Sequence, residues 1–280
     1  LHENVPEGFE LVDALSPEAY GNLADCEYLI SRLDIDPDII NHTPNVKFWQ
    51  RWGAGFDHVD LKAWGERGIP IATCPGVNSG IVAELAIMLM LAGYRNLLQI
   101  NRQLRAGHWP RTEYFGRSFM IKGKTVGVLG LGHIGKKVAA LASAFGANVI
   151  YYDIVRQPEQ EEQFGYRFVD FDTLLKESDI FTIHCPLNEE TRGMIGAAQF
   201  AKMKPTAMLI NTARGPIVDE AALVDALTTG KIATAGLDTY EHEPLPKDHP
   251  LLTLDNVVAS AHAGGNTKDN DINIDRKSVV

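Results

Sequence analysis

Three glycines and one aspartate have the types and intervals that binding of a phosphate-bearing cofactor requires. Gly130, Gly132 and Gly135 follow the apolar run 125–129 in the spacing G-x-G-x-x-G, and Asp153 ends the next apolar run. The first glycine permits a tight turn, the second lets a pyrophosphate approach the backbone, and the third lets a helix pack against a strand. The helix N-terminus that follows favours phosphate through its N–H groups and its dipole.

Asp153 indicates which dinucleotide binds. A carboxylate about 20 residues after such a glycine motif accepts hydrogen bonds from a ribose diol and repels a 2′-phosphate. The sequence therefore predicts NAD rather than NADP as the cofactor. Glycine turns are common, so the spacing alone is weak evidence. The strand and helix patterns on either side of the turn give it weight.

A nicotinamide cofactor moves a hydride, so the protein must move the matching proton. His262 is the natural proton carrier, because an imidazole has an unperturbed pKa of about 6.5. A carboxylate beside the ring would orient it and favour its protonated form. Three carboxylates between Asp238 and His262 qualify, and spacing does not choose among them: Glu241, Glu243 and Asp248.

Arg214 carries a planar guanidinium whose shape matches a carboxylate. Together with a histidine and an acid, it predicts reduction of a 2-keto acid. The alternatives are an arginine in a surface loop and a structural histidine, since the chain contains nine histidines. Cys185 lacks a visible activating base and is predicted to line a pocket wall, while His184 is predicted to be structural. His133 is predicted to act as a spacer in the glycine loop.

Strand ends must position these residues. Apolar runs alternate with helical patterns along the chain, which predicts α/β architecture with parallel sheets and helices on their faces. Ligands bind at the carboxyl ends of the strands in such sheets. The predicted strands of the second half of the chain are 125–129, 148–152, 179–184, 207–210, 232–237 and 257–259. Five residues end or follow these strands and are therefore expected at the carboxyl edge of the sheet: Asp153, Cys185, Arg214, Asp238 and His262.

The first half of the chain shows a shorter α/β pattern. Strands are predicted at 9–12, 27–30, 47–52 and 69–72, and helices at 17–23, 37–40 and 61–67, the last capped by Asp60. Residues 79–105 form the longest helical pattern and are expected to connect two domains. Residues 111–124 are expected to form a polar arm.

Composition excludes several classes of protein. The chain has 280 residues, enough for two domains, and a formal net charge of −10 without a basic run. No nucleic acid and no membrane is therefore expected as a partner. The three cysteines lie far apart, without metal-ligand spacing, which predicts no bound metal, no disulfide framework and a cytoplasmic location. No apolar stretch is long enough to span a bilayer.

Six motifs in order resemble those of the D-2-hydroxyacid dehydrogenase family, over nearly the whole chain. They are 52–60, 75–84, 128–135, 211–220, 236–244 and 262–265. The resemblance implies a flavodoxin-like substrate domain (1–94, continued by 266–280) split by an inserted Rossmann NAD-binding domain (95–265). It also implies a homodimer through arms that include residues 95–117. The family's first strand and closing helix are not visible, so the natural protein is expected to extend beyond both ends.

The resemblance also implies roles for individual residues. Arg214, Glu243 and His262 would form a catalytic triad: the arginine binds the substrate, the glutamate pairs with the histidine, and the histidine is the acid/base. The implied substrate-binding residues are Trp52, Ala54, Gly55 and Arg214. The implied cofactor-binding residues are Val82, Gly130, Gly132, His133, Ile134, Gly135, Asp153, Cys185, Pro186, Thr191, Thr212, Ala213, Asp238 and Gly264.

The leading hypothesis is an NAD-dependent oxidoreductase that transfers a hydride between NAD(H) and a small 2-keto or 2-hydroxy acid. The alternative is an NAD(H)-sensing, corepressor-like binding protein without turnover, because such a protein can keep the same motifs. The sequence does not name the acid. Trp52 is bulky for a substrate loop and is the sequence's one indication of pocket size.

Overall fold

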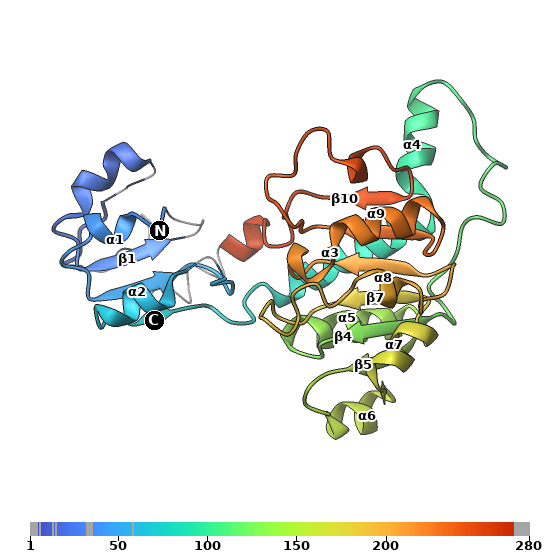
Figure 1. The fold of residues 1–280 in the computed structure, drawn as a ribbon, viewed down its shortest axis with the longest axis horizontal. Helices are drawn as coiled ribbons and strands as arrows, with labels where there is room; N and C mark the ends of the chain where they lie inside the picture. Colours follow the sequence, from blue (N-terminus) through green and yellow to red (C-terminus); the bar gives the residue numbers. More distant parts are fainter. Residues whose placement is uncertain are drawn as a thin grey trace. The chain divides into compact units, whose positions relative to one another are not determined.

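The computed structural model describes residues 5, 7–12, 14, 16–31, 36–57 and 59–271 (Figure 1). The chain divides into two compact units, Leu1–Asn78 with Asn266–Val280, and Ser79–Gly265. The predicted boundary lay within the long helical pattern, at 94/95, whereas the second unit begins at Ser79. The reason is that α3 (Ser79–Tyr94) packs against elements of the second unit. These are α5 (His133–Ala144) and the strands β8 (Met208–Asn211), β9 (Thr234–Leu237) and β10 (Val257–Ala259).

The first unit holds a three-stranded parallel sheet in the order β1-β2-β3. Its elements are η2 (Pro17–Leu23), β1 (Tyr28–Ser31), α1 (Ile39–His42), β2 (Phe48–Arg51), α2 (Leu61–Glu66) and β3 (Ile71–Ala72). Trp49 and Trp64 pack in its core with ring centroids 4.9 Å apart. Asp60 caps α2 as predicted, accepting a hydrogen bond from Ala63 N at 2.9 Å. The predicted strand at 9–12 is wrong: the segment has no strand structure and pairs with none of the described strands, and Phe9 is 56% exposed.

The second unit is built on a seven-stranded, fully parallel sheet in the order β10-β9-β8-β7-β4-β5-β6. The strands are β4 (Thr125–Leu129), β5 (Asn148–Tyr152), β6 (Arg167–Phe168), β7 (Ile180–Ile183), β8 (Met208–Asn211), β9 (Thr234–Leu237) and β10 (Val257–Ala259). The chain starts in the middle of the sheet at β4, moves outward through β5 and β6, and returns to β7 on the other side. This doubly wound order places a topological switch point, and hence the expected ligand crevice, between β4 and β7.

Helices cover both faces of this sheet (Figure 1). The helices of this unit are α3, α4 (Leu97–Arg105), α5 (His133–Ala144), α6 (Pro158–Phe164), α7 (Phe171–Glu177), α8 (Ala197–Phe200) and α9 (Glu220–Thr228), with short 3₁₀ turns η3 (Gly215–Ile217) and η4 (Pro250–Leu252). Alternate strand residues supply two cores. Val128 and Ile210 pack with α3 and α5, while Leu129 and Leu209 pack with α7, α8 and α9.

The longest helical pattern forms two helices rather than one. α3 and α4 are bent by 63°. Asn96 lies at the break in a left-handed conformation with φ 50°, which asparagine tolerates better than most residues. Within the described residues, no single helix has the length and apolar character to cross a membrane, and only this bent pair taken together reaches that threshold.

Candidate active site

The glycine turn between β4 and α5 has the geometry that its three positions predicted. Gly130 has φ +89°, and a Cβ there would lie 2.7 Å from the backbone nitrogen of Cys185. A Cβ on Gly135 would lie 2.0 Å from the carbonyl oxygen of Gly130, whereas a Cβ on Gly132 would meet nothing within 4 Å. The first and third glycines are therefore required by packing within the protein. The second leaves open space at the helix N-terminus, which fits a pyrophosphate.

Asp153 follows β5 and is bound to the same turn. Its Oδ2 accepts a hydrogen bond from Leu131 N at 2.7 Å, and its Oδ1 accepts one from Val155 N at 3.3 Å. Gln157 Nε2 also donates to the Leu131 carbonyl at 2.8 Å. A carboxylate accepts about four hydrogen bonds, so two backbone donors leave capacity for a ribose diol.

The end of β8 carries a buried polar atom without a partner. Thr212 Oγ1 has no hydrogen-bond partner among the described residues, although the side chain is buried. Buried hydroxyls are normally satisfied, so a ligand in the crevice would supply the missing bond. Next to it, Ala213 N donates to Asn211 Oδ1 at 3.0 Å, which fixes the turn that leads to Arg214.

Other residues expected at the cofactor lie on neighbouring strand ends. A Cβ on Gly264 would lie 2.9 Å from Asp238 Oδ2 and 3.5 Å from Val82 Cγ2, so these three residues lie together. Burial raises the pKa of the Cys185 thiol to about 11, which agrees with a pocket wall rather than a nucleophile. The Thr191 hydroxyl donates within its own loop, to the Pro186 carbonyl at 2.7 Å.

The first turn of α5 carries the remaining two cofactor candidates. His133 is the first residue of the helix and is exposed, while Ile134 is partly buried against the core shared with α3. Near β7, burial lowers the pKa of His184 to about 3. His184 is thus neutral at physiological pH, and its Nε2 lies 2.8 Å from Thr182 Oγ1.

His262 pairs with Glu243. His262 Nδ1 lies 2.6 Å from Glu243 Oε2, and Glu243 Oε1 accepts a hydrogen bond from Tyr240 N at 2.9 Å. Of the three carboxylates that spacing left open, Glu243 is therefore the one that contacts the histidine. Because Nδ1 faces the carboxylate, Nε2 is the nitrogen left to exchange a proton with a substrate. The His262 side chain is 48% exposed, so solvent or a ligand can reach it.

Asp238 anchors the segment that carries His262. It is 1% exposed, and its oxygens accept hydrogen bonds from Ser260 Oγ at 2.6 Å, Ala263 N at 2.8 Å and Gly264 N at 2.9 Å. His262 N donates to the Asp238 carbonyl at 2.8 Å, with φ 49° at the histidine. Three donors compensate the buried carboxylate and fix the backbone on both sides of the histidine.

Arg214 follows β8 in a loop that touches the loop carrying Glu243. Asn211 Nδ2 donates to the Arg214 carbonyl at 2.9 Å. A Cβ on Gly215 would lie 1.9 Å from the carbonyl carbon of Tyr240, so the two backbones are in direct contact. This contact brings the predicted arginine and acid motifs together at the carboxyl edge of the sheet.

The residues predicted for the substrate loop belong to the first unit. Trp52, Ala54 and Gly55 follow β2 and are half-buried. Arg51 Nε donates to the Gly55 carbonyl at 3.2 Å, and Cys74 N donates to the Gly53 carbonyl at 2.8 Å, so the loop is held by its own unit.

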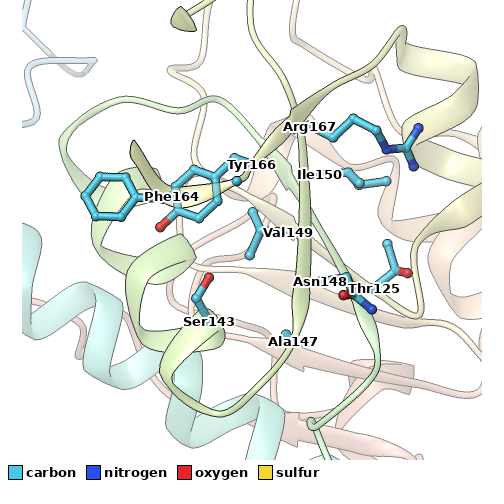
Figure 2. Close-up of a pocket in the computed structure, with 10 residues that line it drawn as sticks. Thr125, Ser143, Ala147, Asn148, Val149, Ile150, Phe164, Tyr166 and Arg167 are labelled. Atoms are coloured by element: carbon cyan, nitrogen blue, oxygen red, sulfur yellow. The ribbon is translucent and has the colours of Figure 1, made fainter. Parts of the chain in front are cut away.

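The second unit also has a hollow of about 550 Å³ (Figure 2). Thr125 and Asn148, the first residues of β4 and β5, line it together with Phe164, Tyr166 and Arg167. It therefore lies at the amino edge of the sheet, opposite the strand ends at which a doubly wound fold binds its ligand. Within the described residues, no group of three or more His, Cys, Asp and Glu side chains is arranged to hold a metal ion.

Comparison with known proteins agrees with this geometry. Residues 87–264 match the family model of the D-isomer specific 2-hydroxyacid dehydrogenase NAD binding domain. The chain is 44% identical over 244 residues to D-3-phosphoglycerate dehydrogenase of Archaeoglobus fulgidus, covering 87% of this chain and 46% of that protein. It is 43% identical over 255 residues to glyoxylate reductase of Thermofilum pendens, covering 89% and 75%. The chain thus spans about half the length of the first relative and three quarters of the second.

Solved structures give the same result. The crystal structure of a glyoxylate reductase from Paecilomyes thermophila has a TM-score of 0.81 at 35% identity, with 92% of this chain and 80% of that one covered. D-lactate dehydrogenase with NAD+ from Lactobacillus jensenii has a TM-score of 0.77 at 33% identity, with 95% and 85% covered. The chain belongs to the D-isomer specific 2-hydroxyacid dehydrogenase family. The members of this family are oxidoreductases with a Rossmann NAD-binding domain.

The predicted family, fold class and cofactor are therefore confirmed. The proteins named above are dehydrogenases and reductases, so they give no support to the corepressor-like alternative. The individual site residues remain predictions.

Proposed function

We propose that this protein transfers a hydride between NAD(H) and a small 2-keto or 2-hydroxy acid, with Arg214, Glu243 and His262 as the catalytic residues. The observation that carries the proposal is the 2.6 Å pair between His262 Nδ1 and Glu243 Oε2, at the carboxyl edge of an NAD-binding sheet. Bound nicotinamide supplies the hydride chemistry, and the protein supplies the proton and the substrate contacts.

His262 donates its Nε2 proton to the carbonyl oxygen of the keto acid during reduction and takes it back during oxidation. Glu243 holds the ring at Nδ1 and stabilises the imidazolium, so the proton is exchanged only at Nε2. Arg214 binds the substrate carboxylate through its guanidinium. The first unit acts as the substrate domain: the backbone N–H groups of Ala54 and Gly55 bind substrate, and Trp52 limits substrate size.

The second unit holds the cofactor along the strand ends from Asp153 to Gly264. Asp153 accepts the hydroxyls of the adenosine ribose, and its charge disfavours the 2′-phosphate of NADP. The Thr212 hydroxyl, which has no partner among the described residues, donates to the bound dinucleotide. Small acids are the favoured substrates because the named relatives are reductases or dehydrogenases of glyoxylate, phosphoglycerate and lactate.

We also propose a cytoplasmic homodimer that uses α4 and the arm after it. Figure 1 shows this segment projecting away from the sheet, and α4 has no buried residue. Leu97, Leu98 and Leu104 are 54%, 45% and 48% exposed, and Trp109 and Phe115 are 77% and 75% exposed. A patch of large apolar side chains in water marks a surface for association. The three cysteines are free thiols, which suits a reducing compartment.

The test is oxidation of NADH by glyoxylate, hydroxypyruvate, pyruvate and phosphohydroxypyruvate, with His262→Gln and Arg214→Ala as matched variants. Loss of the general acid should lower kcat by about 10²- to 10⁴-fold, while NADH still binds. Arg214→Ala should chiefly raise KM for the keto acid. Turnover that is insensitive to both substitutions would show that these residues are not the catalytic groups.

A further inference from the structure

We propose that Glu220, whose carboxylate also contacts His249, positions the Glu243–His262 pair. The proposal rests on the proposed function, since it assigns a role within the same site. Glu220 is the first residue of α9 and lies in none of the positions assigned to substrate or cofactor. Its carboxylate is nevertheless buried, with the side chain 10% exposed.

The carboxylate is turned toward the acidic loop rather than its own helix. Glu220 Oε1 accepts a hydrogen bond from Glu241 N at 2.6 Å. The N-terminus of α9 is already capped by Asp219, which accepts from Ala222 N at 2.9 Å. A buried carboxylate needs compensation, and here the backbone of the loop that carries Glu243 provides it.

His249 lies beside the second oxygen of Glu220. His249 Nε2 lies 3.3 Å from Glu220 Oε2. His249 Nδ1 accepts from Leu251 N at 3.4 Å, at the start of η4. Since Nδ1 accepts, Nε2 carries the proton and faces the carboxylate. One oxygen of Glu220 therefore accepts from the acidic loop, and the other lies beside the His249 ring.

The loop from Tyr240 to Glu243 links this anchor to the proton donor. Tyr240 N donates to Glu243 Oε1 at 2.9 Å, and Tyr240 Oη donates to the Ser260 carbonyl at 2.8 Å, two residues before His262. Burial, together with the neighbouring carboxylates of Asp238, Glu220 and Glu243, raises the pKa of Tyr240 to about 12. The Glu220 contact thus holds the loop at Glu241, between Tyr240 and Glu243.

Loss of the Glu220 contact would leave Glu241 N–H without its acceptor, and the loop would shift to find another. A misplacement of about 1 Å far from the chemistry can lower a rate by about 10²-fold. Cofactor affinity should not change, because Gly132 and Asp153 lie in other loops. We therefore expect Glu220→Ala to lower kcat by roughly 10²-fold, with the Kd for NADH and the KM for the keto acid little altered.

The experiment compares Glu220→Ala with Glu220→Gln, whose amide oxygen can still accept from Glu241 N. Recovery of most of the wild-type kcat in Glu220→Gln supports the proposal. Glu159→Ala is the matched control, because Glu159 also lies in a first helical turn but is exposed. Coupling to Glu243 is measured by making Glu220→Ala in a Glu243→Gln background, where it should have little further effect.

Three results would overturn the proposal: wild-type kcat in Glu220→Ala, an equal loss in the Glu243→Gln background, or loss of NADH binding together with kcat. If Glu220→Ala does not fold, Glu220→Asp is used in its place. The aspartate keeps the negative charge, but its shorter side chain moves the carboxylate oxygen away from Glu241 N. An active aspartate variant with an impaired glutamine variant would show that charge, not position, matters.

Imidazole ¹⁵N resonances of His262 separate this proposal from the proposed function, because they report the Glu243 contact without turnover. If the wild-type chain reduces no keto acid, the proposed function fails. The positioning role still stands if Glu220→Ala perturbs those resonances and Glu220→Gln does not. Unchanged resonances in Glu220→Ala would refute it.

Discussion

Two glycine substitutions in the same turn should differ in their effect on the stability of the free protein, although both should weaken cofactor binding. A Cβ on Gly132 meets nothing, whereas a Cβ on Gly135 would lie 2.0 Å from the Gly130 carbonyl oxygen. Gly132→Ala should therefore change the free energy of unfolding by no more than about 0.5 kcal/mol. Gly135→Ala forces the helix off the strand and should destabilise by about 1–3 kcal/mol, or about 2–12 °C in Tm for a domain of this size.

The effect on cofactor binding is measured by the stability that NADH adds. At a concentration 100 times its Kd, NADH adds about 2.7 kcal/mol to wild-type stability, which raises Tm by about 5–11 °C. If the new methyl group occupies the place of the pyrophosphate and raises Kd by about 100-fold, the same NADH concentration adds only about 0.4 kcal/mol.

Thermal unfolding with and without NADH measures both quantities in one assay. Gly132→Ala should keep its unliganded Tm and lose the NADH shift, and Gly135→Ala should lose both. A full NADH shift in Gly132→Ala would refute the assignment of the open space to the pyrophosphate. Wild-type stability of Gly135→Ala would refute the packing argument.

Three further outcomes follow from the second unit. Asp153→Asn keeps an acceptor for Leu131 N but removes the charge, so the ratio of NADPH affinity to NADH affinity should rise. Fluorescence titration with each cofactor measures this ratio, and an unchanged ratio would contradict the role of the charge. Alkylation of Cys185, measured by peptide mass spectrometry, should be slow at neutral pH and should accelerate as the pH approaches the thiol pKa of about 11. Rapid labelling at pH 7 would contradict the burial of this thiol. Hydrogen bonds led by that from Arg156 lower the pKa of Glu161 from 4.5 to about 2, so the pair stabilises the fold above pH 4.5 and is lost as pH falls toward 2. The Tm difference between wild type and Glu161→Gln should shrink over that range, and a constant difference would argue against the pair.

Local patterns were sufficient to predict six of the seven strands in the sheet of the second unit. Its strands are continuous apolar runs because helices cover both faces, and such runs end where the chain leaves the sheet. The glycine spacing also located the turn, since Gly130 and Gly135 are fixed by contacts with residues nearby in space. The two-residue strand β6 lies below the length at which a hydrophobic pattern is visible.

Predictions failed where tertiary contacts decide the outcome. Residues 9–12 have the composition of an edge strand but no neighbour to pair with. The apolar helical pattern continues past Asn96, because the residue in the left-handed conformation is an asparagine, and Gly93, the nearest glycine, still lies within α3. Glu220 resembles an ordinary acidic residue in a first helical turn, and only the folded chain shows its carboxylate bound to Glu241 N.

The left-handed backbone of His262 has a consequence for evolution in the laboratory. A non-glycine residue at φ 49° carries about 1 kcal/mol or more of conformational strain that glycine would not carry. Variants selected only for thermal tolerance should therefore drift toward glycine at this position and gain stability while losing the proposed proton donor. The histidine persists only under selection for turnover, so a screen that omits an activity assay will favour inert proteins.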